Sequence, residues 1–294
     1  MSVTKRLNRL YKTAPRIAFD KKSKLVFFSD CHRGEGGWAD NFAKNQGLYF
    51  HALNYYYDNG YTYFELGDGE ELWENKDFCE IVNTYRHIYW MMSRFYKKGR
   101  LYMLLGNHDL EKKNPKKTTC LNSYYDERER RTVELCPNLK FHEALVLRHK
   151  ETKSEFFLIH GHQADFINYN LWIISRFLVR YVWKPLEMIG VHDPTSAAKN
   201  HSKSISVERK LIKWSQDQKR MLIAGHTHRP VFPTGNEPLY FNDGSCVHPR
   251  CITCLEIEND EIMLVKWSYV INKDGAVYAQ RQLLEEPRKI PSFQ

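Results

Sequence analysis

The sequence predicts an α/β protein built around a parallel β-sheet. In the first 105 residues, short apolar runs alternate with longer segments of helical periodicity, and each run ends in a turn containing glycine. A strand–helix–strand order joins parallel strands through helical crossovers. The chain has 294 residues, of which 42% are hydrophobic and 27% charged. This composition is typical of a globular protein and excludes disorder, collagen and coiled coil as the main architecture.

The first part of the chain supplies three of the expected strands and two of the expected helices. The runs 24–30, 61–66 and 100–105 are short and apolar, which predicts buried strands. Residues 41–58 and 77–98 carry apolar side chains at helical spacing, and a glycine follows closely after each segment. The resulting order of elements is the one that predicts the parallel sheet.

The rest of the chain is more irregular. Further strands are expected at 140–149, 154–160 and 221–224, and in short runs within 238–280. The segment 163–219 has no strand character, so we expect a helical insertion there. Since the sequence shows neither an internal repeat nor a low-complexity linker, we expect a single domain over 1–294.

The charge balance indicates an acidic partner. The chain carries 44 Lys and Arg against 35 Asp and Glu, a net charge of +9. Nucleic acid, an anionic membrane face and a phosphorylated small molecule all fit this charge. The 7 cysteines are too few for a disulfide scaffold, and their odd number argues against full pairing and for a reducing compartment. Without an apolar segment of spanning length or a signal-peptide pattern, we expect a cytoplasmic protein.

Polar side chains that can coordinate metals follow five of the predicted strands. They are Asp30 with His32, Asp68, Asn107 with His108, His160 with His162, and His226 with His228. Ligands of an open α/β sheet bind beyond the carboxyl ends of its strands, so these residues predict one shared site. Mixed imidazole, carboxylate and amide donors fit Mn²⁺, Fe, Zn or Co, and no cysteine cluster indicates structural zinc. So many donors fit two metals about 3.5–4 Å apart.

Five short motifs surround these residues in one order along the chain. They are SDCHRG at 29–34, GDGEELWE at 67–74, GNHD at 106–109, HGH at 160–162 and GHTHRP at 225–230. Together they resemble the calcineurin-like metallophosphoesterases. Three further features, Trp73, the Ser-Lys-Ser at 202–204 and the stretch 241–258, resemble more loosely the UDP-2,3-diacylglucosamine hydrolases within that superfamily.

The resemblance implies a fold and a role for each residue. The fold is an α/β metallophosphoesterase-type sandwich of two β-sheets flanked by helices, with the insertion as a helical lid. One metal is held by Asp30, His32 and His228, the other by Asn107, His160 and His226, and Asp68 bridges the two. His108 stabilises the transition state or protonates the leaving group, and Asp109 orients His108. Two divalent ions are implied, and we expect Mn²⁺.

Other residues near the motifs have a plainer interpretation. His162 follows His160 by two positions and is expected to face away from the metals. Glu70 and Glu71 are expected to cap a helix or face solvent. Cys31 alternates with its neighbours in an extended segment, so we expect it to be buried.

The insertion contains an apolar segment with a basic stripe. Arg176, Arg180 and Lys184 are spaced four apart, so they line up on one side of a helix. Two interpretations remain open. In the first, the insertion is a helical hairpin packed on the body of the protein. In the second, it is a lid that binds an acyl group or an anionic membrane, with the stripe and Lys203 contacting phosphate.

These observations and the resemblance predict hydrolysis of a phosphoester or pyrophosphate bond by a metal-bridging hydroxide. The expected substrate is a phosphorylated small molecule or a nucleotide- or lipid-linked pyrophosphate such as UDP-diacylglucosamine, with peripheral membrane contact. The alternatives are a phosphomonoesterase for proteins or small molecules and a nucleic-acid phosphodiesterase, although no nucleic-acid-binding module is found. A non-enzymatic scaffold is disfavoured, because such a protein is expected to lose ligands and all seven are present.

Overall fold

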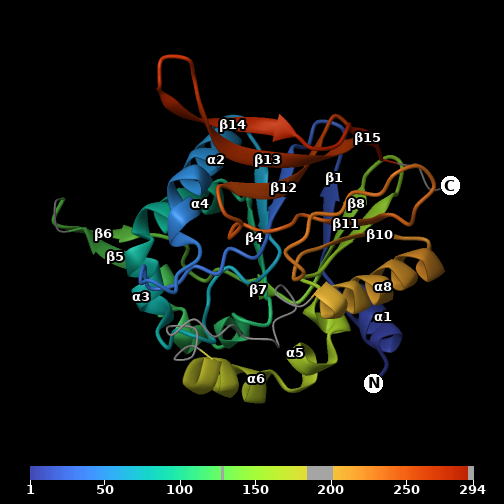
Figure 1. The fold of residues 1–294 in the computed structure, drawn as a ribbon, viewed down its shortest axis with the longest axis horizontal. Coiled ribbons are helices and arrows are strands. Elements are labelled where there is room, and N and C mark those ends of the chain that lie inside the picture. The colour runs from blue at the N-terminus through green and yellow to red at the C-terminus, as the bar shows by residue number, and fades with distance from the viewer. Residues whose placement is uncertain (127–128, 184–200, 291–294) are drawn as a thin grey trace.

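The computed structural model describes residues 1–126, 129–183 and 201–290. Two β-sheets pack face to face and helices cover their outer faces (Figure 1). The core between the sheets contains Phe27, Phe64 and Leu255 from one sheet and Phe156 and Ile223 from the other. The predicted α/β class and the predicted sandwich of two sheets are therefore confirmed. The expectation of a single domain stays a prediction.

The larger sheet has eight strands in the order β14-β13-β12-β2-β3-β4-β7, with β15 pairing to β13. Strands β2, β3, β4 and β7 are parallel, while β12, β13 and β14 are antiparallel to their neighbours. The bounds are β2 Leu25–Phe28, β3 Thr62–Glu65, β4 Leu101–Leu104, β7 Phe141–His142, β12 Cys251–Glu258, β13 Glu261–Ile271, β14 Val277–Leu283 and β15 Arg288–Lys289.

The smaller sheet has five strands in the order β1-β8-β9-β10-β11. Strands β9, β10 and β11 are parallel, β8 runs antiparallel to β9, and β1 is parallel to β8. The bounds are β1 Arg16–Phe19, β8 Leu145–His149, β9 Glu155–Leu158, β10 Met221–Ala224 and β11 Tyr240–Asn242. A separate hairpin joins β5 Ser123–Asp126 to β6 Arg131–Glu134.

Each outer face is covered by helices with an apolar side. On the larger sheet, Tyr49 and Leu53 of α2 pack near Phe28 and Tyr63 of the strands. On the smaller sheet, α1 and α8 enclose an apolar cluster that includes Leu7. The α-helices are α1 Val3–Thr13, α2 Gln46–Asp58, α3 Phe78–Thr84, α4 Arg86–Lys97, α5 Phe166–Asn170, α6 Trp172–Leu178 and α8 His201–Gln218. The short 3₁₀ turns are η1 Ala43–Asn45, η2 Leu110–Lys113, η3 Pro115–Lys117, η4 Thr119–Leu121 and η5 His162–Ala164. The element η6 Val179–Trp183 is a π-helix.

Most predicted elements occur where the sequence indicates, with two breaks. The strand expected over 140–149 is divided into β7, in the larger sheet, and β8, in the smaller sheet. The helix expected over 77–98 is divided at Tyr85, which ends α3 and begins α4. The hydroxyl of Tyr85 donates a hydrogen bond of 2.5 Å to Asp40, so this side chain is anchored away from the helix axis. The described part of the insertion is helical, as expected. Within the described chain, no helix is both long and apolar enough to cross a bilayer.

One disulfide joins two short helical segments. Cys79 at the start of α3 is bonded to Cys120 in η4, and the other five cysteines are free. The odd number of cysteines therefore does leave thiols unpaired. The bond links the segment between β3 and β4 to the segment between β4 and β5.

Candidate metal centre

The seven predicted ligands lie beyond the carboxyl ends of strands from both sheets. Strands β2, β3 and β4 of the larger sheet and β9 and β10 of the smaller sheet end at the same edge of the sandwich. The ligands are Asp30, His32, Asp68, Asn107, His160, His226 and His228, and all except His32 and His228 are at least nine-tenths buried. The five strand ends therefore deliver their polar side chains to one place, as the sequence predicts.

The backbone at five of these residues is left-handed. The φ angles of Asp30, His32, Asp68, His226 and His228 lie between 48° and 69°. This region is uncommon for residues other than glycine, and it concentrates at functional sites where the surrounding structure imposes it. The chain therefore turns abruptly after β2, β3 and β10, where these ligands lie.

Two flanking glycines allow the loops to approach each other closely. A Cβ atom on Gly106 would lie 2.0 Å from Oδ1 of Asp68, and one on Gly225 would lie 2.6 Å from Oδ2 of Asp30. Neither position has room for a side chain.

The first group of ligand atoms comes from Asp30, His32 and His228. Nε2 of His228 lies 3.0 Å from Oδ1 of Asp30 and 3.1 Å from Nε2 of His32. Nε2 of His32 is 3.7 Å from the same Asp30 oxygen. Three donors that converge at these separations form one side of a coordination sphere.

The second group comes from Asp68, His160 and His226, whose ligand atoms all lie within 4.8 Å of one another. Oδ2 of Asp68 is 3.0 Å from Nε2 of His160 and 3.8 Å from Nε2 of His32. One oxygen of Asp68 is thus close to donors of both groups, which is the position that a bridging carboxylate needs.

The atoms that face the centre are buried and make no hydrogen bond in the described structure. They are Oδ1 of Asp30, both amide atoms of Asn107, Nε2 of His160 and Nε2 of His226. A buried polar atom without a partner costs about 1–3 kcal/mol, and more for a charged group. So many orphaned atoms at one point fit bound metal, and the mixture of imidazole, carboxylate and amide fits transition metals.

The opposite atoms of the same side chains are held by the protein. Oδ2 of Asp30 accepts a hydrogen bond of 2.8 Å from the backbone N–H of His226, and Oδ1 of Asp68 accepts one of 2.8 Å from that of His108. Nδ1 of His160 lies 3.0 Å from the carbonyl oxygen of Leu66, which fixes the proton on Nδ1. These contacts leave one oxygen of each carboxylate and the Nε2 lone pair of His160 for metal.

Glu71 joins the centre, contrary to the sequence-based expectation that it caps a helix or faces solvent. Its carboxylate lies 2.7 Å from Nδ1 of His32 and 2.6 Å from Nδ1 of His108. The expectation was wrong because residues 68–71 run alongside residues 30–33, with hydrogen bonds between the two segments. In the sequence, the only indication of this role was that Glu71 follows Asp68 by three residues.

His108 stands at the mouth of the centre with its ring held on two sides. Besides the contact with Glu71, the ring stacks on Trp73 with 4.1 Å between the centroids. Its side chain retains 20% exposure. Burial alone would lower the pKa of His108, but the carboxylates of Glu71 and Asp68 outweigh it and raise that pKa. The contact with Glu71 therefore keeps a proton on Nδ1 of the ring.

Asp109 does not orient His108, which corrects a second expectation. Its carboxylate accepts hydrogen bonds from the backbone N–H groups of Gly69 and Gly106, at 3.1 and 2.6 Å, and pairs with Lys112 at 2.7 Å. Asp109 therefore ties together the two loops that follow β3 and β4. The orienting carboxylate is that of Glu71.

A match to a protein family agrees with this geometry. The family model described as calcineurin-like phosphoesterase matches residues 23–230, which include every ligand named above. The chain belongs to the calcineurin-like phosphoesterase family. It is thus a metallophosphoesterase, a hydrolase that acts on phosphoester bonds.

The solved structures that match this phosphoesterase are distant from it in sequence. A predicted phosphoesterase from Streptococcus pneumoniae is 15% identical, with 89% of this chain and 97% of that chain covered and a TM-score of 0.37. Vacuolar protein sorting 29 from Cryptosporidium parvum is 14% identical, with 90% and 98% covered and a TM-score of 0.40. A putative 5'-nucleotidase from Staphylococcus aureus is 12% identical, with 92% and 55% covered and a TM-score of 0.34. Among curated proteins, none matches the chain.

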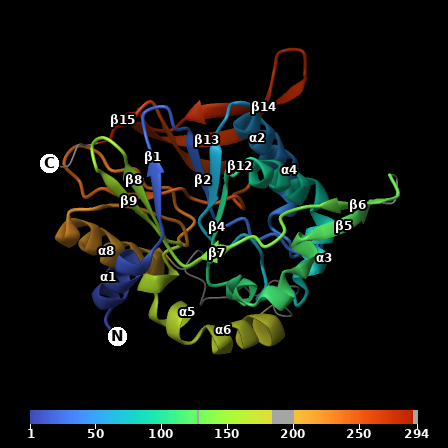
Figure 2. The same ribbon diagram turned by 180° about the vertical axis from the view of Figure 1, so that it is seen from behind.

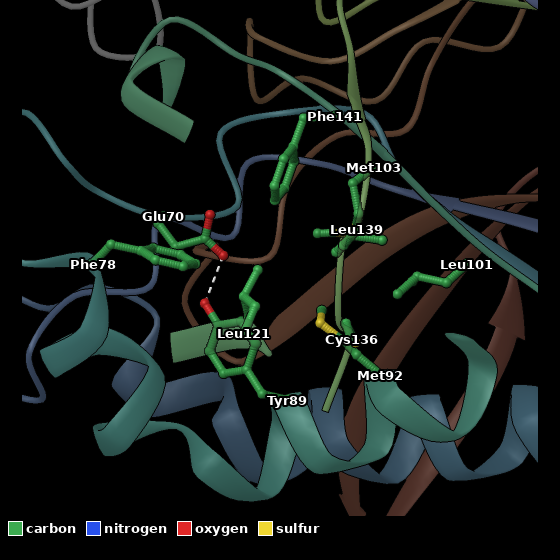
Figure 3. Close-up of a pocket in the computed structure, with 10 residues that line it drawn as sticks. All are labelled: Glu70, Phe78, Tyr89, Met92, Leu101, Met103, Leu121, Cys136, Leu139 and Phe141. Carbon is green, nitrogen blue, oxygen red and sulfur yellow. Dashed lines mark hydrogen bonds between the residues drawn. The ribbon is translucent and has the colours of Figure 1, made fainter. Parts of the chain in front are cut away.

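A buried network of charged side chains lies next to the metal centre of the phosphoesterase. Glu70 is 1% exposed, so the expectation that it caps a helix or faces solvent was wrong. Its carboxylate accepts hydrogen bonds from Arg33 and Tyr89, both 2.6 Å, and from Lys112 at 2.5 Å. The cations Lys112 and Arg33 outweigh the effect of burial and, with the hydrogen bonds, lower the pKa of Glu70 to about 2. Glu70 also borders an apolar pocket, where its contact with Tyr89 is visible (Figure 3).

His162 lies beside the second ligand group without belonging to it. The ring is 4% exposed and stacks on Tyr169, with 5.9 Å between the centroids. It is 5.5 Å from the ring of His160. Cys31, by contrast, is fully buried in the apolar core, as the alternation of an extended segment predicts.

The expected phosphate-binding stripe is largely engaged with the protein itself. Arg176 pairs with Glu111, and Arg180 donates hydrogen bonds to the carbonyl oxygens of Trp73, Leu72 and Asn75 at 3.0, 2.5 and 3.2 Å. Arg176 therefore attaches α6 to η2, and Arg180 attaches η6 to the loop that carries Glu71.

Two lysines, Lys184 and Lys203, were also expected to bind phosphate. Lys203 lies 3.3 Å from Asp165, which in turn is 3.6 Å from Nε2 of His226. Lys203 therefore lies near the metal centre, and Asp165 links it to the predicted ligand His226. Lys184 falls outside the described residues.

Proposed function

We propose that this phosphoesterase hydrolyses its substrate with two divalent metal ions, Mn²⁺ in preference to Fe, Zn or Co. The observation that carries the proposal is the set of orphaned buried donor atoms on Asp30, Asn107, His160 and His226. Asp30, His160 and His226 belong to the two ligand groups, and Asn107 follows β4. The position of Asp68 between the groups supports a shared carboxylate.

When bound, the two ions would activate a water molecule as nucleophile and neutralise charge on the phosphate oxygens. The protein itself contributes His108. Its protonated imidazole is placed at the rim of the centre, where it donates a hydrogen bond to a phosphate oxygen or a proton to the leaving group. Glu71 keeps that proton on the ring, and the Trp73 stack fixes the plane of the ring.

For the substrate, we propose a phosphoester or pyrophosphate with an apolar portion, such as a lipid-linked nucleotide. The support is local: Arg180 attaches η6 to the loop of Trp73, whose ring stacks on His108, and α6 and η6 expose large apolar side chains. A small phosphomonoester, a phosphopeptide or a nucleic acid would leave that surface unused.

The test is a substrate panel with the metal-reconstituted protein. It compares aryl phosphate mono- and diesters, UDP-acylglucosamine, nucleotides, a phosphopeptide and single-stranded DNA, each with Mn²⁺, Fe²⁺, Zn²⁺ or Co²⁺. We expect the highest kcat/KM for the acylated pyrophosphate with Mn²⁺. Preference for a phosphopeptide or for DNA would refute the substrate assignment. Full turnover in a preparation stripped of metal would refute the mechanism.

A further inference from the structure

The helical insertion presents an outward surface that consists of large apolar side chains. Over Leu171 and the helices α6 and η6, the exposed fractions range from 38% to 59%. We call this surface the α6 face; its residues are Leu171, Ile173, Ile174, Phe177, Leu178, Tyr181 and Val182. Scattered apolar residues are normal on a protein surface, but a contiguous patch of this kind marks an interaction site.

The charges of the same helical segment point inward. Arg176 and Arg180 are the only charged residues between 171 and 183, and both are bound to the body of the protein. A helix facing water has the opposite arrangement, with its charges outside and its apolar residues inside. The α6 face is therefore built to meet an apolar phase.

Basic segments lie on two sides of the α6 face. On one side is α1, whose Lys5, Arg9 and Lys12 are exposed, and residues 1–13 contain no acidic residue. Helix α1 is joined to α5, because the guanidinium of Arg6 lies 3.6 Å from the ring centroid of Tyr169. Both views show α1, α5 and α6 along one end of the molecule (Figures 1 and 2).

On the other side, residues 112–117 carry four lysines and no acidic residue. Lys113, Lys116 and Lys117 are exposed. The neighbouring Glu143 pairs with Lys113, and Glu111 lies 4.0 Å from Lys117, so this side keeps a smaller positive excess. The contact between Arg176 and Glu111 places the segment directly against α6.

We propose that the α6 face docks on an anionic lipid bilayer. The apolar side chains enter the boundary between headgroups and acyl chains, and the two basic segments contact the anionic headgroups. A second copy of this chain is a poorer occupant. A twofold axis through the α6 face would bring the basic flanks of both copies together, and like charges repel.

Docking in this orientation holds the metal centre near the bilayer, because Arg180 attaches η6 to the loop of Trp73, whose ring stacks on His108. The inference thus deepens the proposed function by naming the physical location of an amphiphilic substrate. Binding to vesicles needs neither substrate nor turnover, so a failure of docking and a failure of hydrolysis are separate results.

The experiment measures binding of the full chain to sedimented vesicles. Vesicles of phosphatidylcholine with about one quarter phosphatidylglycerol are compared with pure phosphatidylcholine, at low and high salt. We expect tighter binding to the anionic vesicles, weakened by salt. Ile173→Ser with Phe177→Ser should lower the partition coefficient about tenfold or more, because two inserted apolar side chains are lost. Arg9→Gln with Lys12→Gln should lower it about fivefold per residue on the anionic vesicles only.

Matched variants control for exposure and charge. Ile271→Ser with Val277→Ser removes two apolar side chains that are 72% and 63% exposed on the β13–β14 hairpin, at the opposite end of the molecule (Figure 1). Lys21→Gln with Lys22→Gln removes two exposed charges in the turn between β1 and β2. Both controls should bind as the wild type does.

Three results would overturn the proposal. The first is equal binding to neutral and anionic vesicles. The second is an equal loss of binding in the control variants, or a loss in the α6-face variant that follows a lowered melting temperature. The third is a dimer in solution that Phe177→Ser converts to monomer, which would make the α6 face a contact between copies of this chain.

Discussion

Replacing Glu71 by glutamine should disable either metal binding or proton donation, and the structure says why. The carboxylate lies 2.7 Å from Nδ1 of His32 and 2.6 Å from Nδ1 of His108. A carboxylate accepts a hydrogen from both rings at once. An amide of the same size accepts from one ring and must donate to the other.

The two orientations of the new amide have different consequences. If its NH₂ group faces His32, Nδ1 of that ring becomes an acceptor, the proton moves to Nε2, and the lone pair needed for metal is lost. If it faces His108, that ring loses its charged partner and becomes neutral. A hydrogen bond to a charged group contributes about 1.5–3 kcal/mol, or roughly 10- to 150-fold in rate or affinity.

The assay combines metal content with kcat. We expect Glu71→Gln to lower metal affinity by about 10- to 100-fold, as for other residues that orient a metal-bound histidine, or to lower kcat by about 10²-fold at full metal occupancy. Glu80→Gln, at an exposed position in α3, is the control. Wild-type metal content together with wild-type kcat in Glu71→Gln would show that this carboxylate has neither role.

Three further predictions concern the same centre. Chelation should abolish activity, and Mn²⁺ should restore it better than Mg²⁺ because imidazole ligands suit the former; restoration by Mg²⁺ alone would contradict the donor set. His108→Ala should lower kcat by about 10²–10⁴-fold with metal retained, whereas Asp68→Ala should lose both; metal loss in His108→Ala would place this residue among the ligands. Because the fold lowers the pKa of Glu70 from 4.5 to about 2, its stabilising effect is complete above pH 4.5 and is lost as the pH falls toward 2. The melting temperature of the wild type should therefore fall in acid more steeply than that of Glu70→Gln, and parallel curves would contradict this.

The sequence was informative about the metal centre because each ligand follows a short apolar run. A strand fixes where its carboxyl end lies, so Asp30, Asp68 and His226 could be assigned to one edge without knowledge of the loops. Residues beyond the strand ends were harder to place. Glu71 was misassigned because its position depends on the pairing of two loops, which leaves no periodic pattern in the sequence.

The helical insertion shows the other limit of the sequence. Spacing placed Arg176 and Arg180 on one side of a helix, and they do share a side. It could not show which side faces the protein. That choice depends on Glu111 and on the carbonyl oxygens of Leu72, Trp73 and Asn75, which are distant in the chain.

The left-handed backbone at five ligands has a consequence for attempts to redesign the metal preference. Asp, Asn and His tolerate this conformation better than most residues, while other side chains pay roughly 1–2 kcal/mol each. Exchanging a ligand for Cys or Glu to favour a softer or harder ion would therefore strain the loop before any ion binds. A protein engineer would do better to leave these five positions intact and to vary the hydrogen-bond partners behind them, such as Ser29, whose hydroxyl donates to Asp30 at 2.5 Å.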